Sequence, residues 1–173
     1  MEVSAIVKEI AGLEFLGPLT PEIRTQIADV FADVSDILKY DDGEAMINAG
    51  YLSFGSGLVL VSGSATLEWD DRESVEITAP ILLGEMAQFR TVDLRSATVR
   101  AHGTAIGAQF YWQDLYAGTR ESLPPESLKA FQDAIELQSW DRFQYKEILT
   151  LPLISGLSEE VRIKVCRPLS TLS

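Results

Sequence analysis

One segment, ILLGEMAQFRTVDLRSATVRA at residues 81–101, combines a glycine, an acid and an arginine between two apolar runs. Gly84 ends the first run, and the good helix formers at 85–88 predict one helical turn. The first N–H groups of such a turn have no internal partners and form a small anion cradle. The planar fork of Arg95 suits two bonds to a phosphate, and the ionised Glu85 can accept a bond from a sugar hydroxyl. These residues predict a site that binds a phosphate group and, beside it, a carboxylate that accepts a hydrogen bond from a ligand hydroxyl.

Two alternatives remain open at this segment. Glu85 and Arg95 could form an ordinary surface ion pair, worth about 0–1 kcal/mol, that flanks a strand. Arg90 could replace Arg95 as the phosphate ligand. We favour Arg95, because it opens an alternating run with Ser96 and Ala97 behind it, whereas Arg90 lies in the middle of a loop.

The order Gly84-Glu85-Met86-Ala87, then Arg95-Ser96-Ala97-Thr98, resembles the phosphate-binding cassette of cyclic nucleotide-binding domains. Catabolite activator proteins and the regulatory subunits of protein kinase A belong to this family. The resemblance implies that Glu85 binds the ribose 2′-hydroxyl and Arg95 the cyclic phosphate of cAMP or cGMP, with no further cofactor and no metal. The implied ligand-binding set is Gly84, Glu85, Met86, Ala87, Arg95 and Ser96.

Two residues depart from the pattern of that family. Leu94 stands where many members have proline, and Asp93 places a second acid near the arginine. The alternative function is therefore a degenerate domain that keeps the fold and acts as a protein-interaction module without nucleotide.

Composition limits the class of protein. With 173 residues and 46% hydrophobic content, the chain is long enough for one domain with a real core. A net charge of −12 opposes DNA binding, because phosphate backbones require clustered Lys and Arg. The amino terminus lacks the features of a signal peptide, and Cys166 is the single cysteine. No apolar segment approaches the ~20 residues of a membrane span. We therefore expect a cytoplasmic protein that binds neither DNA nor membrane.

Helical spacing of apolar residues predicts two helices between Ser4 and Phe31, broken at Gly17-Pro18, with the second starting at Thr20-Pro21. From Ser35 onward, short strands alternate with glycine and aspartate turns. The predicted strands are Ile37–Tyr40, Ala45–Asn48, Leu58–Ser62, Ala65–Trp69, Ser74–Thr78, Arg95–Ala101 and Ala105–Phe110. We expect an α+β fold in which a β-roll is flanked by N- and C-terminal helices.

Beyond the strands, a short helix is expected at Tyr111–Gly118 and a longer one from Pro125 to about Glu147. The order of leucine, hydroxyl, glutamate and arginine in residues 151–162 repeats that in residues 13–24. In the family such an entrance precedes each roll. We expect a cyclic nucleotide-binding domain at 5–148 and a helical extension at 149–173 that resembles the entrance of a second domain.

Other reactive side chains are given structural roles. His102 precedes Gly103 and is expected in a turn, and Cys166 has no nearby histidine to activate it. Trp140 and Tyr145 could stack on a base, but helical aromatic residues more often pack against a core. With no nucleophile and base in sequence reach, we expect a sensor that signals through its C-terminal helices and is not an enzyme. Its partners would be a cyclic nucleotide and either a regulated protein or a second copy of itself.

Overall fold

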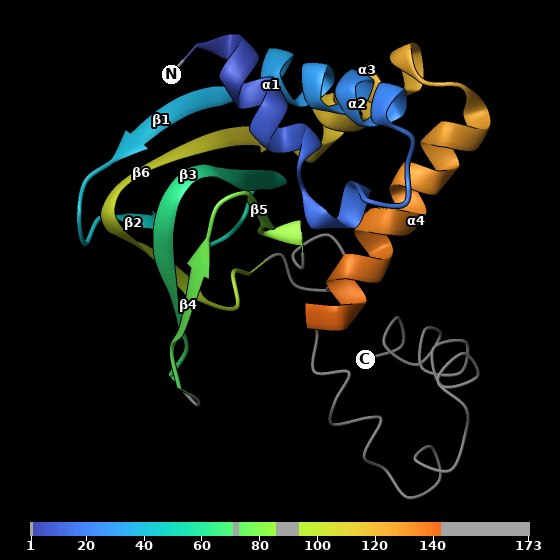
Figure 1. Cartoon of the computed structure of the whole chain (residues 1–173). Helices are drawn as coiled ribbons and strands as arrows, with labels where there is room; N and C mark the ends of the chain where they lie inside the picture. The colour runs from blue at the N-terminus through green and yellow to red at the C-terminus, as the bar shows by residue number, and fades with distance from the viewer. Residues whose placement is uncertain (1, 71–72, 86–93, 143–173) are drawn as a thin grey trace, which may run out of the picture.

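The computed structural model describes residues 2–70, 73–85 and 94–142, with side chains in the last helix described up to residue 138. Helices and strands form separate parts of the molecule (Figure 1). The strands curl into a roll, three helices lie over one side of it, and the last helix runs down beside it. The expected α+β fold, a β-roll flanked by helices, is confirmed.

The second amino-terminal helix starts where its sequence predicts, whereas the first ends before the expected break at Gly17-Pro18. Helix α1 covers Val3–Ala11, the short 3-10 helix η1 covers Glu14–Leu16, and α2 covers Pro21–Asp33. Thr20 caps α2, because its hydroxyl oxygen accepts a bond of 3.4 Å from the N–H of Ile23. Proline follows at the first helical position, where a missing N–H costs nothing.

The sheet is antiparallel throughout its described pairings. Strand β6 pairs with β1, β2 and β3, and β3 pairs in turn with β4 and β5. The strands are β1 (Asp36–Tyr40), β2 (Ala45–Ile47), β3 (Ser56–Glu68), β4 (Val75–Thr78), β5 (Ile81–Leu83) and β6 (Thr98–Tyr111). The two long strands, β3 and β6, therefore form the centre on which the shorter ones are arranged.

The sequence prediction was wrong in dividing each long strand into two. Gly63 and Gly103 were interpreted as turns, but both lie inside continuous strands at positive φ, +92° and +69°. The β3–β6 register shifts around Ser62, so the extra residue bends the pair without ending it. His102 consequently lies in β6 opposite Ser64, not in a turn.

Alternation along β3 creates two apolar clusters on opposite faces of the sheet. Val59 and Val61 belong to the helix-side core, which includes Phe31 and Phe110. Leu58 and Leu60 face the other way. This roll-side cluster contains Tyr40, Leu58, Leu60, Ala65, Leu83, Val99, Ala101 and Ala105.

The carboxyl-terminal helices close the helix-side core. Helix α3 covers Trp112–Ser122 and α4 covers Pro125–Arg142. Phe131 of α4 is fully buried, and its ring lies edge-on to Phe31 with 6.3 Å between ring centroids. Among the described residues, no helix combines the length and apolar character required to cross a bilayer.

Several predictions fall on residues that are not described. These are the base-stacking roles of the Trp140 side chain and Tyr145, the environment of Cys166, and the extension at 149–173. The expected domain boundary between 148 and 149 also lies outside the described residues and stays a prediction.

Candidate functional site

The predicted cassette begins where β5 ends, at a position that requires glycine. Gly84 has a φ of +83°, a backbone conformation that side chains with a Cβ rarely adopt. A Cβ built there would overlap the Nη1 atom of Arg95. Glycine therefore allows the guanidinium to lie directly against the backbone of the cassette.

Arg95 joins the two ends of the candidate site. Its Nη1 donates to the carbonyl oxygen of Gly84 at 3.1 Å. Its Nη2 donates to the carbonyl oxygen of Ser56 at 2.7 Å and to the Ser56 hydroxyl at 2.8 Å. The guanidinium is thus held in one plane between the end of β5 and the start of β3.

The backbone of Arg95 is fixed as well. Its N–H donates to the carbonyl of Tyr51, and its carbonyl accepts from the N–H of Gly50, each at 2.9 Å. Next to it, Leu94 forms an isolated antiparallel bridge with Leu52. Arg95 therefore lies before β6. The prediction that Arg95 opens this strand was wrong. Paired backbone and three side-chain bonds give the guanidinium a defined direction.

Glu85 follows Gly84 and is 1% exposed. Such burial contradicts the alternative of an ordinary surface ion pair, because a carboxylate taken out of water must be stabilised by its surroundings. Of the other predicted site residues, Ser96 is exposed, directly after Arg95. Met86 and Ala87 lie outside the described residues, as do the competitor Arg90 and the additional acid Asp93.

An apolar wall lies in the roll, on four adjacent strands. Val99 of β6 is 3% exposed and is paired with Leu67 of β3 on one side and Ile47 of β2 on the other. Leu67 and Ile47 are only half-buried, as is Ile77 on β4. Such a wall can pack against a flat apolar group without further burial of polar atoms.

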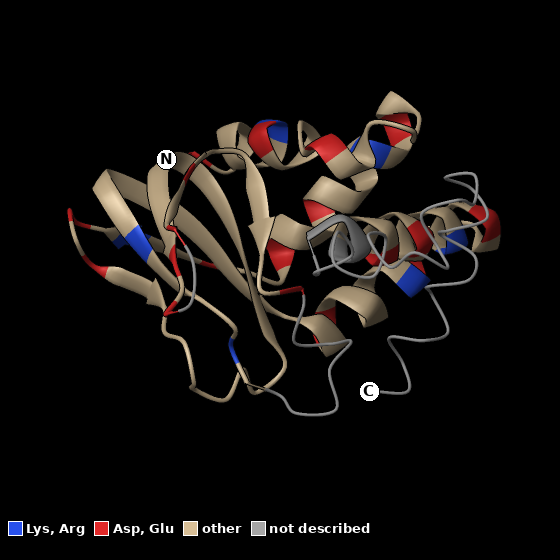
Figure 2. Cartoon of the chain, turned by 90° about the horizontal axis from the view of Figure 1, so that it is seen from below, with Lys and Arg blue, Asp and Glu red and all other residues tan. Residues whose placement is uncertain are grey.

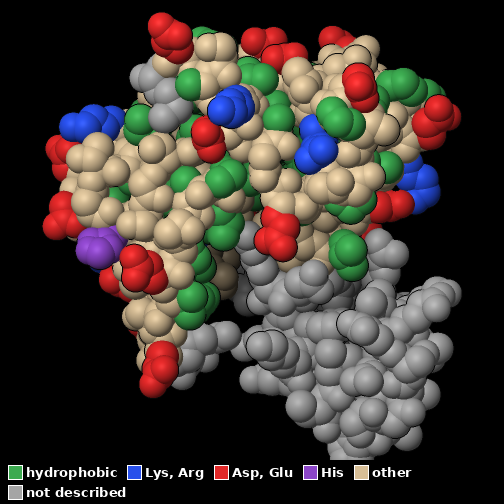
Figure 3. Space-filling model, viewed as in Figure 1, with side chains coloured by type: hydrophobic (Ala, Val, Ile, Leu, Met, Phe, Trp, Pro, Cys, Tyr) green, Lys and Arg blue, Asp and Glu red, His purple; other side chains and the backbone are tan. Residues whose placement is uncertain are grey.

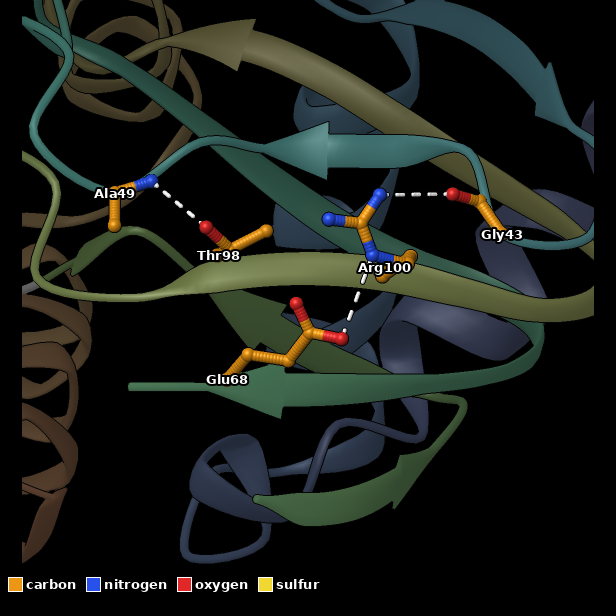
Figure 4. A network of polar contacts seen from close by, with 5 residues as sticks. All are labelled: Gly43, Ala49, Glu68, Thr98 and Arg100. Carbon is orange, nitrogen blue, oxygen red and sulfur yellow. Dashed lines mark hydrogen bonds and ion pairs between the residues drawn. The ribbon is translucent and has the colours of Figure 1, made fainter. Parts of the chain in front are cut away.

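A polar network connects β3 and β6 with the segments on either side of β2 (Figure 4). The Thr98 hydroxyl accepts a 3.1 Å bond from the N–H of Ala49. Arg100 donates through Nη1 to the carbonyl of Gly43 at 3.0 Å and through Nε to a carboxylate oxygen of Glu68 at 3.4 Å. Arg100 therefore has partners that connect β2, β6 and β3, and its role here is structural.

Acidic residues occur on both the roll and the helices, with fewer basic ones among them (Figure 2). Two side chains that are not among the Arg95 contacts described above have a shifted pKa. Burial, with a smaller effect of the charge on Glu44, raises the pKa of Tyr40. A hydrogen bond from its own backbone N–H lowers the pKa of Glu22, and a hydrogen bond from the Thr20 side chain has a smaller effect in the same direction.

Within residues 2–70, 73–85 and 94–142, no group of three or more His, Cys, Asp or Glu side chains is arranged to hold a metal ion.

Solved structures of known proteins have a similar fold. The regulatory domain of Toxoplasma gondii PKA, solved with cAMP, matches 83% of this chain and 50% of its own, with a TM-score of 0.61 and 18% identity. The sensor domain of the transcriptional regulator DNR from Pseudomonas aeruginosa matches 84% of this chain and 98% of its own, with a TM-score of 0.59 and 16% identity. The chain has the cyclic nucleotide-binding fold.

One sequence relative matches the chain over a shorter stretch. The Pycsar effector protein RsmPycTIR of Rhodovulum sp. (strain MB263) is 34% identical over 77 residues, which cover 43% of this chain and 30% of the effector. No model of a known protein family matches the chain. The solved structures confirm the resemblance to the cyclic nucleotide-binding domains at the level of the fold.

Within this fold, Ser56 is the site residue that the sequence analysis missed. Its hydroxyl and carbonyl both contact Arg95, although 39 positions separate the two residues in the chain. The sequence offered only a hydroxyl between Gly55 and Gly57, interpreted as part of a turn. Gly57 has a separate packing reason, since a Cβ there would overlap the ring of Phe110.

Proposed function

We propose that this chain is a cyclic nucleotide sensor that binds cAMP or cGMP. The proposed ligand-binding residues are Gly84, Glu85, Met86, Ala87, Arg95 and Ser96. Arg95 would bind the cyclic phosphate and Glu85 the ribose 2′-hydroxyl. The observation that carries the proposal is the position of the Arg95 guanidinium, held against the Gly84 carbonyl with Glu85 buried at the next position.

Two of the partners of Arg95 support an exchange on binding. Gly84 and Ser56 offer it uncharged carbonyl and hydroxyl oxygens. A phosphate instead offers ionised oxygens, which a guanidinium can bind through two parallel bonds. The net charge of −12 does not oppose a small ligand, because carboxylates more than a Debye length of about 8–10 Å away are screened.

Helix α4 provides a route from this site to the C-terminal part of the chain. Gln138 of α4 donates to the carbonyl of Leu82 at 3.5 Å, two residues before Gly84. A groove of about 610 Å³ separates α4 in part from η1 and the β4–β5 turn, with Phe15, Pro80 and Leu137 in its lining. Since the helix is incompletely packed there, few contacts oppose a change in its position. A ligand that alters β5 would then favour one position of α4 over another.

The name of the Rhodovulum relative, an effector, supports a role in which this domain controls an output. We propose no catalytic step within the chain itself. The second candidate remains the interaction module without nucleotide. It is favoured by Leu94, which stands 36% exposed where relatives commonly have proline.

A thermal shift assay tests the proposal with cAMP and cGMP, and with AMP and GMP as non-cyclic controls. A cyclic nucleotide at 100 times its dissociation constant should stabilise the fold by about 2.7 kcal/mol, and the controls should stabilise it much less. Amide exchange across residues 125–138 should change with the same ligand. If no cyclic nucleotide stabilises the chain, the interaction module replaces the sensor.

A further inference from the structure

The groove between α4, η1 and the β4–β5 turn has the size and lining of a docking site. Its volume of about 610 Å³ is roughly four times that of a cavity that holds a benzene molecule, so it can accept several apolar side chains. Among its described lining residues, Glu14 is the only one with an ionisable side chain. Leu13, Phe15, Ile81 and Leu137 contribute apolar surface to it. The groove therefore suits an uncharged apolar segment.

A segment of that chemistry follows α4 in the chain. Residues 148–157, ILTLPLISGL, contain no Asp, Glu, Lys or Arg, although the chain has a net charge of −12. Residues 143–147 separate this segment from Arg142, the last residue of α4. Leu137 lies about 8 Å back along the helix axis, whereas five extended residues span about 17 Å. The segment can therefore reach back to the groove.

The first copy of the repeated motif shows how such a sequence packs against α4. Residues 13–19 (LEFLGPL) and 151–157 (LPLISGL) both have apolar residues at their first, third, fourth and seventh positions. In the first copy, Leu16 is fully buried, and the ring centroid of Phe15 lies 6.4 Å from that of Phe131 on α4. The same apolar spacing in the second copy suits the next turn of α4, which lines the groove.

Charge favours this segment over a second copy of the chain as the occupant. Acidic side chains are scattered over the surface seen in Figure 3, so two copies repel each other as they approach. The uncharged segment meets no such repulsion. As part of the same chain, close to its site, it also has an effective concentration on the order of millimolar.

We propose that residues 148–157 dock in the groove of their own chain, with Leu151, Leu153 and Ile154 against its apolar lining. This contact fastens the carboxyl-terminal part of α4 to η1. It also limits the movement of α4 beside β5, where Gln138 donates to the carbonyl of Leu82. The docking itself does not rest on nucleotide binding.

Thiol labelling of the full chain without nucleotide tests whether this segment covers the groove. Cys166→Ser removes the single cysteine, and Leu137→Cys then places one thiol in the groove. Leu153→Asp should raise the rate at which this thiol reacts with a maleimide at least about tenfold, because burial of the new carboxylate opposes docking. Leu172→Asp makes the same change outside the segment and should leave the rate unchanged.

Val75→Cys on β4 is the matched control for the thiol, because Val75 and Leu137 are 50% and 49% exposed. In the same Cys166→Ser background it should react at one rate with and without Leu153→Asp. A rise confined to the groove thiol therefore excludes general unfolding.

Three results would overturn the proposal. Equal rates for the groove thiol with and without Leu153→Asp would mean that the segment does not cover the groove. An equal rise with Leu172→Asp would remove its specificity. Protection that disappears when the protein is diluted would assign the groove to a second copy of the chain.

Discussion

The two faces of the sheet bury apolar side chains to different extents. On the helix side, Phe31, Phe110 and Phe131 are at most 1% exposed, and Phe31 meets Phe110 edge-on at 5.0 Å between centroids. On the roll side, Leu58 and Leu60 are buried, but Ile47, Leu67 and Ile77 around them are only half-buried. The two faces therefore differ in role. The closed face stabilises the fold, and we propose that the open face provides a wall for a ligand.

The largest expected effect is a difference in folding stability between a variant of the helix side and a variant of the roll side. Phe31→Ala should cost about 3–5 kcal/mol, because it removes a fully buried aromatic ring and leaves a cavity. Replacing a fully buried leucine by alanine costs about 2–5 kcal/mol. Leu67→Ala should cost less than this, because the Leu67 side chain already contacts solvent. Urea denaturation of both variants measures the difference. Equal losses would mean that both faces are closed cores.

Leu67→Ala sharpens the comparison further when ligand affinity is measured on the same protein. If the roll wall packs against the base, the dissociation constant for the preferred cyclic nucleotide should rise about 3- to 10-fold, in line with the burial of one or two methylene groups. The control is Val3→Ala, which truncates an apolar residue on α1 that is 65% exposed. It should leave the affinity unchanged.

A smaller and more specific effect is expected from Glu85→Gln. The amide keeps the shape of the carboxylate but weakens a bond to a hydroxyl by about 1 kcal/mol. The parent should therefore prefer cAMP over 2′-deoxy-cAMP more strongly than the variant does, as competition binding would show. An identical preference in both proteins would mean that Glu85 does not bind the ribose 2′-hydroxyl.

Local signals were enough to predict where α2 begins. The hydroxyl of Thr20 and the proline after it mark its start because capping depends on neighbouring residues only. The turn residues between the strands likewise predicted strands within β3. The division at Gly63 was wrong because a glycine at positive φ serves a bulge as well as a turn, and pairing with β6 decides between them.

The cassette could be found from its sequence, but its surroundings could not. Gly84, Glu85 and Arg95 form a short-range pattern. The contact of Arg95 with Ser56 depends on the path of the chain across 39 positions. The exposed ring of Phe54 was also unexpected, because a positive φ at phenylalanine contradicts local preference and follows from the bonds of Ser53.

The central claim is that Arg95 binds the phosphate of a cyclic nucleotide, and calorimetry with cAMP and cGMP tests it most directly. Arg95→Gln should bind the preferred ligand at least about tenfold more weakly than the parent, since a charged hydrogen bond contributes about 1.5–3 kcal/mol. Arg100→Gln is the matched control, because Arg100 also donates to a glycine carbonyl, that of Gly43. It should retain the parental affinity. Equal affinity in the parent and Arg95→Gln, with the fold intact in both, would contradict the account.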